Sequence, residues 1–433
     1  MNEQKQQPLF QKDFTLVVIG QIISLFGNAI LRFALPLYIL TLSGSAALFG
    51  IVSATSFLPM IIMSPIGGII ADRVNKQRIM VVLDFFTSGL ILAYILISGN
   101  VSSPVLPVVV LMMALYGIQG VYSPSVQASI PLLAREEQLV TANAVVNLVQ
   151  SFSGLLGPVI GGVLYAAYGL SPILVVSVFC FFFAAVMELF IRIPHQPRND
   201  RRGIFAIVKS DLSDSVRFIL KERPILAKGI VLICGFNLFL SSMLVIGLPV
   251  LVTQYLGMSE QLYGIAQGVL AAGGLAGGIL AGVLGKKLDI RRSYILLLIC
   301  AIAIIPMGLT LFFQIPALGS YLVITAISFI IMVCATLFSV QMLAFAQSQT
   351  PVELTGKVIS FLMAISMCAQ PVGQALYGVL FEQLIDLPWI VVLGSAGISA
   401  IIAVYSKAIF KMIDTRPVRS IKVDEVSVGN GES

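Results

Sequence analysis

The chain has 433 residues, of which 58% are hydrophobic and only 11% are charged, with 26 Lys and Arg residues against 20 Asp and Glu residues. Soluble globular proteins carry about 25% charged residues, so this content is too low to cover the surface of a soluble particle of this size. The composition excludes a soluble enzyme, a nucleic-acid-binding protein and a disordered chain, and it leaves a polytopic membrane protein.

Twelve apolar runs are long enough to cross a bilayer, because a transmembrane helix needs about 20 mostly apolar residues. The first run is too long for the apolar region of a signal peptide, so we expect it to be retained. The predicted spans are 15–40, 45–70, 79–98, 104–130, 143–167, 172–193, 227–253, 262–284, 294–313, 319–345, 358–381 and 388–409.

A long polar stretch after the sixth span divides the predicted helices into two groups of six. The sequence therefore predicts an all-α polytopic membrane protein whose 12 transmembrane helices form two pseudo-symmetric six-helix bundles. Its predicted parts are an N-terminal bundle (1–193), a cytoplasmic central loop (194–228), a C-terminal bundle (229–410) and a cytoplasmic tail (411–433).

Lys and Arg residues fix the expected orientation, because basic residues favour cytoplasmic loops. With the N-terminus inside, all but one of the 26 basic residues fall in cytoplasmic segments, and the exception is Arg32 within the first span. We therefore expect a multi-pass protein of a bacterial plasma membrane with both termini in the cytoplasm. The formal net charge of +6 then indicates contact with anionic lipid of the inner leaflet, and no nucleic-acid partner.

An internal repeat relates the two predicted bundles. Four groups of similar residues recur 213 or 214 positions later in the corresponding helices, which is typical of parallel repeats in secondary transporters. They are Leu35-Pro36-Leu37 with Leu248-Pro249-Val250, Phe49-Gly50-Ile51 with Tyr263-Gly264-Ile265, the Gly68 segment with the Gly282 segment, and Gly157-Pro158 with Gln370-Pro371.

The segment that joins the second and third spans reads Gly68-Ile-Ile-Ala-Asp72-Arg73-Val-Asn75-Lys76-Gln-Arg78. It resembles the G-x-x-x-D-R-x-G-x-x-R/K signature of the major facilitator superfamily, and Asn75 replaces a glycine at a position where asparagine also tolerates a left-handed turn. The resemblance implies a conformational latch, in which Asp72 accepts charge-assisted hydrogen bonds that break when the bundles move. Gly68 would allow close helix approach, and Arg73, Lys76 and Arg78 would complete the latch. The alternative is a basic loop that only fixes topology.

The fifth span contains glycines on both sides of a proline, in the run Gly154-Leu-Leu-Gly157-Pro158-Val-Ile-Gly161-Gly162. This run resembles a motif of exporters and drug/proton antiporters within the superfamily. Small residues allow helices to approach closely, and the proline allows a bend. The alternative is ordinary packing of small residues between helices.

Segments of the first half also resemble the macrolide-efflux and siderophore-export branch of the family. These segments are Gly20 to Asn28, Ser43-Gly44-Ser45 and Tyr122 to Leu139. The resemblance implies a monomeric secondary active transporter that exports lipophilic or amphiphilic small molecules, such as macrolide-like drugs, by alternating access and proton antiport. A siderophore exporter and a lysolipid transporter are the alternatives, and a membrane-embedded enzyme or receptor is a remote one.

The sequence predicts no cofactor, metal or nucleotide site. The five cysteines lie far apart in apolar runs, and the single histidine, His195, lies in a charged loop, so neither a transition-metal site nor a disulfide framework is expected. A phosphate-binding P-loop motif and an intramembrane catalytic constellation are both missing from the sequence, which argues against ATP-driven transport and against an enzyme. The energy source implied by the family resemblance is a proton gradient.

Polar residues within spans are the candidates for a substrate cavity, because such residues usually face the bundle interior or water. At 100° per residue they share one face of the first span and one face of the fourth. The alternative is hydrogen bonding between helices, and for Arg32 it is snorkelling toward the membrane surface. The predicted cavity residues are Gln21, Ser24, Asn28, Arg32, Tyr116, Gln119, Ser123 and Asn237.

Two acidic residues within spans, Asp84 and Glu188, are the candidates for proton coupling. Both could instead form structural ion pairs, Asp84 with Arg73 or Arg78 and Glu188 with Arg192 four residues later. The family pattern R-x-x-Q-G of the fourth span has Tyr116 in place of its arginine, so the residue often associated with proton coupling is missing.

Overall fold

The computed structural model describes residues 9–99, 103–194, 212–284 and 289–411. Within these ranges it does not describe the side chains of Asp72, Glu136, Val140, Val352, Glu353 and Lys411. About half of the predicted central loop (195–211), nearly all of the predicted tail, His195 and Lys286 therefore lie outside the described residues.

Twelve helices in the described part of the chain are long and apolar enough to span a membrane, as the sequence predicts. Their ends lie within a few residues of the predicted limits. The first six are α1 (Lys12–Ser43), α2 (Ala46–Arg73), α3 (Lys76–Ser98), α4 (Val105–Leu133), α5 (Leu139–Tyr168) and α6 (Leu170–Leu189).

The seventh span, Pro224–Tyr255, is continuous but changes helix type along its length. It begins inside the stretch that the sequence assigns to the central loop, because a proline in the first helical turn loses no hydrogen bond. Its parts are α8 (Pro224–Phe236), a π-helical turn (Asn237–Ser241), α9 (Ser242–Pro249) and a second π-helical turn (Val250–Tyr255). The remaining spans are α10 (Glu260–Leu284), α11 (Tyr294–Phe312), α12 (Ala317–Ser348), α13 (Val352–Gln383) and α14 (Pro388–Lys411).

Small residues cap the helix ends on both sides of α2. Gly44 ends α1 in a left-handed conformation with φ of 64°, which glycine adopts without strain, and the Ser45 side chain accepts a hydrogen bond from Leu48 N at the start of α2. Asn75 has φ of −60° and accepts a hydrogen bond from Gln77 N. Asn75 therefore does not use the left-handed conformation that asparagine tolerates, and it acts as the N-cap of α3.

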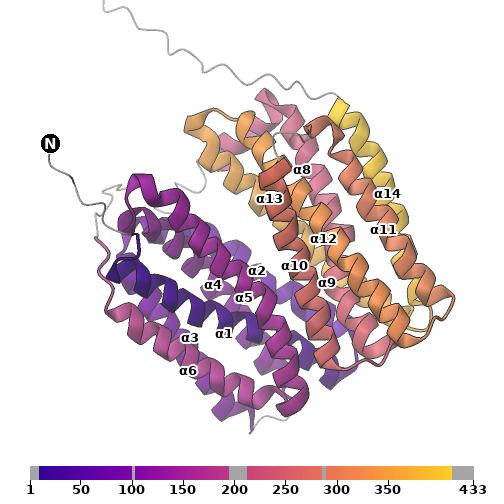
Figure 1. Ribbon diagram of the computed structural model, residues 1–433, viewed down its shortest axis with the longest axis horizontal. Coiled ribbons are helices and arrows are strands. Elements are labelled where there is room, and N and C mark those ends of the chain that lie inside the picture. The colour runs from indigo at the N-terminus through magenta and orange to yellow at the C-terminus, as the bar shows by residue number, and fades with distance from the viewer. Residues whose placement is uncertain (1–8, 100–102, 195–211, 285–288, 412–433) are drawn as a thin grey trace, which may run out of the picture.

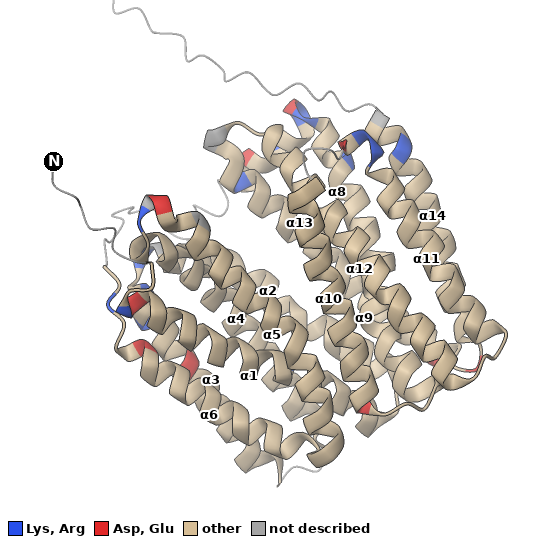
Figure 2. Cartoon of the chain, viewed as in Figure 1, with Lys and Arg blue, Asp and Glu red and all other residues tan. Residues whose placement is uncertain are grey.

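The helices form two bundles, α1–α6 and α8–α14, that diverge toward one end and meet at the other (Figure 1). The Lys and Arg residues gather at the diverging end, which we call the basic end (Figure 2). One hydrophobic core is shared between the bundles and joins Phe33, Leu37 and Phe49 to residues of α9, α10 and α13. The two halves are therefore held together mainly at the end opposite the basic one, which we call the closed end.

Two pairs of glycines let the bundles touch backbone to backbone at the closed end. A Cβ atom on Gly50 of α2 would lie 2.8 Å from Gly378 Cα of α13, and one on Gly162 of α5 would lie 2.9 Å from Gly264 Cα of α10. Real Cβ contacts are essentially never so short, so each pair needs glycine. Gly50 and Gly264 are equivalent positions of the sequence repeat, which shows that the repeat builds a pseudo-symmetric pair of contacts.

A charge-assisted hydrogen bond also crosses the closed end. Glu382 Oε2 at the end of α13 accepts a bond from Ala47 N at 2.7 Å and a short one from the Ser45 hydroxyl, so it caps the first turn of α2. Negative charge is favourable there because the first N–H groups of a helix lack partners and carry the positive end of its dipole. The carboxylate of one half thus stabilises a helix of the other half only while the closed end is closed.

Glu382→Gln is expected to loosen the closed end modestly. The loss of charge at an exposed helix terminus costs roughly 0.3–1 kcal/mol, so the population open at this end should rise by about 2–5-fold. The measurement is the distance distribution between spin labels at Leu42 and Ile385, which are exposed residues of the two halves. Asp386→Asn, a neighbouring exposed acid, is the control and should leave the distribution unchanged; an equal shift in both variants would contradict the cap.

Candidate substrate cavity and buried carboxyl pair

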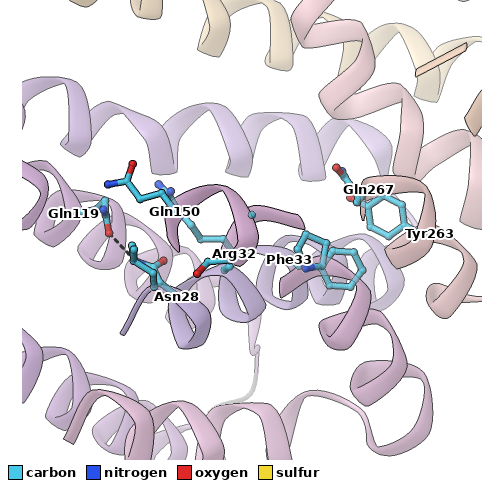
Figure 3. A pocket seen from close by; sticks show the side chains of 12 residues that line it. Asn28, Arg32, Phe33, Gln119, Gln150, Tyr263 and Gln267 are labelled. Atoms are coloured by element: carbon cyan, nitrogen blue, oxygen red, sulfur yellow. Dashed lines mark hydrogen bonds between the residues drawn. The ribbon is translucent and has the colours of Figure 1, made fainter. Parts of the chain in front are cut away.

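A cavity of about 310 Å³ lies between the two bundles and is lined by residues of α1, α4, α5 and α10. Its walls combine amide side chains with aromatic rings, and the Phe33 and Tyr263 rings stack across the two halves with centroids 4.9 Å apart (Figure 3). The lining residues are Leu25, Asn28, Ala29, Arg32, Phe33, Gln119, Gln150, Ser153, Gly154, Pro158, Tyr263 and Gln267.

Three of the predicted cavity residues line this space: Asn28, Arg32 and Gln119. Asn28 Nδ2 donates to Gln119 Oε1 at 2.7 Å and joins α1 to α4 at the cavity wall (Figure 3). The Asn28 Oδ1 atom is buried and has no hydrogen-bond partner in the described part of the chain. An unpaired buried acceptor is unfavourable, so this atom is available to a donor on a bound molecule.

Arg32 lies against the cavity wall and does not extend toward the membrane surface. Its guanidinium carbon is 4.1 Å from the centroid of the Tyr116 ring, and its Nη2 atom is 3.8 Å from Met60 Sδ. Tyr116 thus takes part in the site by supporting Arg32 through a cation–π contact. Arg32 forms no ion pair in the described residues, and its contacts with Met60 and Tyr116 hold it between α2 and α4.

Four other predicted cavity residues lie outside the cavity lining. Asn237 in the first π-helical turn donates to Ser366 O of α13 at 2.9 Å, and Ser123 is not among the lining residues. Gln21 and Ser24 lie nearer the N-terminal end of α1, in a buried polar cluster. The sequence analysis missed Gln150 and Ser153 on α5 and Gln267 on α10. Gln150 lies one helical turn before Gly154, Ser153 is next to Gly154, and Gln267 lies one turn after Tyr263.

The buried polar cluster contains both candidate carboxyl groups. Asp84 of α3 is 2% exposed and Glu188 of α6 is fully buried. The Tyr122 hydroxyl of α4 is 2.9 Å from Glu188 Oε1 and 3.5 Å from Asp84 Oδ2. Because a phenol has a single proton to donate, Tyr122 can satisfy only one of the two carboxyl groups at a time.

Two residues of α1 complete the cluster. Gln21 Nε2 donates to the Tyr122 hydroxyl at 2.7 Å, and the Ser24 hydroxyl donates to Asp84 Oδ1 at 3.2 Å. The second carboxyl oxygen of Glu188, Oε2, is buried without a partner among the described residues. Four helices of the N-terminal bundle therefore meet at two acids whose hydrogen bonding is incomplete.

The ion pairs considered for these acids do not form. In the described residues, where Arg73, Arg78 and Arg192 are present, no basic side chain pairs with Asp84 or Glu188. The Arg192 backbone N–H instead donates to Asp13 Oδ1 at 3.1 Å. The spacing of four residues in α6 was misleading because Glu188 faces the bundle interior, where Tyr122 reaches it first.

The predicted latch is only partly described, since the Asp72 side chain and Lys286 are not. A Cβ atom placed on Gly68 would meet no described atom within 4 Å, so in this conformation none of the described helices makes the expected close approach to Gly68. This agrees with the separation of the bundles at the basic end. Lys76 is largely buried and Arg78 is exposed, both in the first turn of α3 after Asn75, and their role as a latch remains a prediction.

The glycines of α5 have separate partners. Gly157 and Gly161 pack on Ala29 and Phe33 of α1, and Gly162 packs on Gly264 of the other bundle. Gly154 and Pro158 line the cavity, and the Pro158 carbonyl oxygen is 2.6 Å from the position of a Cβ on Gly264. Gly157 and Gly161 of this motif therefore pack α5 on α1, and Gly162 packs α5 against the C-terminal half.

Comparison with known proteins decides the family. The sequence model described as Major Facilitator Superfamily matches residues 17–374. The chain belongs to the major facilitator superfamily. Macrolide efflux protein A of Streptococcus pyogenes is 23% identical over 383 residues, which cover 88% of this chain and 92% of that protein. Enterobactin exporter EntS of Salmonella typhi is 23% identical over 374 residues, which cover 84% of each.

Solved structures of the superfamily share the fold. A bacterial homologue of the human lysosomal transporter Spinster, in an inward-facing and unoccupied conformation, has a TM-score of 0.69 at 14% identity and covers 94% of this chain and 97% of its own. A nucleoside transporter has a TM-score of 0.70 at 12% identity, with 92% and 100% covered. The protein is thus a multi-pass membrane transporter of small molecules with efflux-type relatives, and not an enzyme.

Proposed function

We propose that the protein is a proton-coupled exporter of lipophilic or amphiphilic small molecules in a bacterial plasma membrane. The observation that carries this proposal is the cavity between the bundles, which is lined by both halves and bordered by the stacked rings of Phe33 and Tyr263. The basic end faces the cytoplasm by the positive-inside rule, and both termini lie there. The conformation is then inward-facing, ready to load a molecule from the cytoplasm or inner leaflet.

Proton coupling is supported by the buried carboxyl pair. An ionised carboxylate without a cation is very costly in a medium of low dielectric constant, and two such groups sharing one hydroxyl repel each other. At least one of Asp84 and Glu188 therefore carries a proton in this conformation. The carboxyl pair is thus a proton-binding site within the N-terminal bundle. Release of that proton would leave a negative charge that the surrounding residues do not stabilise in this conformation.

The interface between α1 and α4 links the proton site to the cavity. In this interface Gln21 donates a hydrogen bond to Tyr122 in the carboxyl cluster, and two turns later on α1 Asn28 donates one to Gln119 in the cavity wall. The two hydrogen bonds belong to the same pair of helices, so a shift of α1 against α4 changes both sites together. Protonation and substrate binding therefore both favour one of two positions of α1 relative to α4, and coupled transport requires such a shared change.

Transport by purified protein in proteoliposomes tests the proposal. A panel of a macrolide, a catecholate siderophore and a lysolipid is offered with and without an imposed pH gradient. We expect at least one compound to accumulate only with the gradient and to be released by a protonophore. Accumulation that the protonophore does not abolish contradicts the proposal. A susceptibility panel in an efflux-deficient host that shows no effect of the protein on any amphiphile contradicts it as well.

The siderophore alternative gains support from one feature of the cavity. The only charged residue in its described lining is the cation Arg32, which is poorly matched to a cationic drug. An acidic siderophore would instead bring a charge of the opposite sign to this residue.

A further inference from the structure

We infer that the substrate carries an anionic group that binds Arg32, together with a hydrogen-bond donor and a flat apolar part. The inference deepens the proposed function and rests on it, since it names the chemistry of the transported molecule. An aromatic hydroxy acid is the simplest compound that satisfies all three features.

The anionic group follows from the charge balance of the cavity. Arginine remains ionised in proteins, and none of the other described lining residues is acidic or basic. In the described residues the guanidinium of Arg32 has a ring contact with Tyr116 and a weak hydrogen bond to Met60 Sδ, and neither replaces a carboxylate. A cation within a membrane span is costly unless it is paired or solvated, so an anionic ligand lowers the free energy of this arginine.

The geometry of Arg32 favours a planar anion. The guanidinium carbon lies 4.1 Å from the centroid of the Tyr116 ring, and Arg32 lines the cavity, so its N–H groups can donate to a carboxylate or similar group there. Arginine binds such groups through two parallel hydrogen bonds, a geometry that lysine cannot reproduce. The cation–π contact with Tyr116 therefore holds the Arg32 guanidinium at the cavity wall.

The other two features come from the residues around Arg32. Asn28, one helical turn before it on α1, has a buried Oδ1 atom without a partner among the described residues, which calls for a hydroxyl or N–H donor on the ligand. The stacked rings of Phe33 and Tyr263 form an apolar wall from both halves (Figure 3). A flat aromatic body fits against such a wall.

Binding to purified protein in detergent, measured by calorimetry, tests the inference with three matched probes. They are 3-hydroxy-2-naphthoate, its neutral methyl ester, and the cation 2-naphthylmethylammonium. We expect the anion to bind about 10-fold or more tightly than the ester, because hydrogen bonds to charged groups contribute about 1.5–3 kcal/mol. The cation should bind least tightly.

Arg32→Gln should abolish the preference of the anion over the ester, and Arg32→Lys should retain only part of it. Arg217→Gln, which removes one exposed positive charge outside the cavity, is the control and should keep the full preference. The preference ratio reports on Arg32 itself, because a merely structural role would weaken anion and ester alike.

Equal affinity for anion and ester, no detectable binding of the anion, or a preference that survives Arg32→Gln would each overturn the inference. The assay needs no gradient and no transport. An Arg32-dependent preference without gradient-driven transport would therefore reject the proposed function alone, whereas gradient-driven transport of the cation would reject this inference alone.

Discussion

The double substitution Asp84→Asn with Glu188→Gln is expected to reduce gradient-driven accumulation to the level of protein-free liposomes. Both new side chains resemble the protonated acids in shape but cannot release a proton, so the cluster is fixed in one of its two states. Exchange of substrate across the membrane should persist, because it needs no net proton movement. The measurement is accumulation with a pH gradient and exchange without one, on the same preparation.

The same double variant should fold as well as the wild type. The amides have nearly the same volume as the acids, and removing the possibility of a buried charge is neutral or stabilising. Ser88→Ala is the matched control, because Ser88 is a buried polar residue one turn further along α3 that donates only to Val178 O. Transport lost equally in the control, or gradient-driven accumulation retained by the double variant, would show that the carboxyl pair does not carry the coupled proton.

Gly264→Leu is the second substitution with a large expected effect, because it should prevent the closed end from closing. A Cβ atom at this position lies 2.6 Å from Pro158 O and 3.0 Å from Gly162 Cα, and backbone atoms cannot move aside as a flexible side chain would. Overpacking costs about 1–3 kcal/mol or more, so the population with the closed end closed should fall by about 5–150-fold. Transport in vesicles should fall in proportion.

Two pairs of spin labels report the conformation of this variant. Leu42 and Ile385 mark the closed end, and Val74 and Leu220 mark the basic end; all four are exposed. We expect the first distance to lengthen and the second to shorten. Gly278→Leu is the control, because nothing described lies within 4 Å of a Cβ at this position of the same helix. Unchanged distances in Gly264→Leu would contradict the close packing of α5 on α10.

Much of the fold could be predicted from the sequence because it depends on local composition. Each span is an apolar run of sufficient length, and backbone hydrogen bonds must be satisfied within the helix in lipid. The repeat also predicted equivalent positions correctly, since Gly50 and Gly264 make matching contacts between the halves. The seventh span begins at Pro224, three residues before its predicted start, because apolar runs give the ends of a helix only approximately.

The site could be predicted only in part, because helical periodicity gives the face of a residue but not its partner. Gln21 and Asn28 share the polar face of α1, yet one joins the carboxyl cluster and the other lines the cavity. The partner of Glu188 is Tyr122, which is distant in sequence, and the i+4 rule pointed to Arg192 instead. Tyr263 and Gln267 come from the other half, so only the packing of the two bundles brings them to Arg32.

Simultaneous recording of internal pH and substrate content in proteoliposomes tests the central claim most directly. The substrate is the compound of the transport panel that the wild-type protein accumulates, and it is applied as a gradient with no initial pH difference. We predict that protons move in the direction opposite to the substrate in the wild type and not at all in the variant carrying Asp84→Asn and Glu188→Gln. Substrate flux without proton flux in the wild type, or proton flux that persists in the double variant, would contradict proton-coupled export through the buried carboxyl pair.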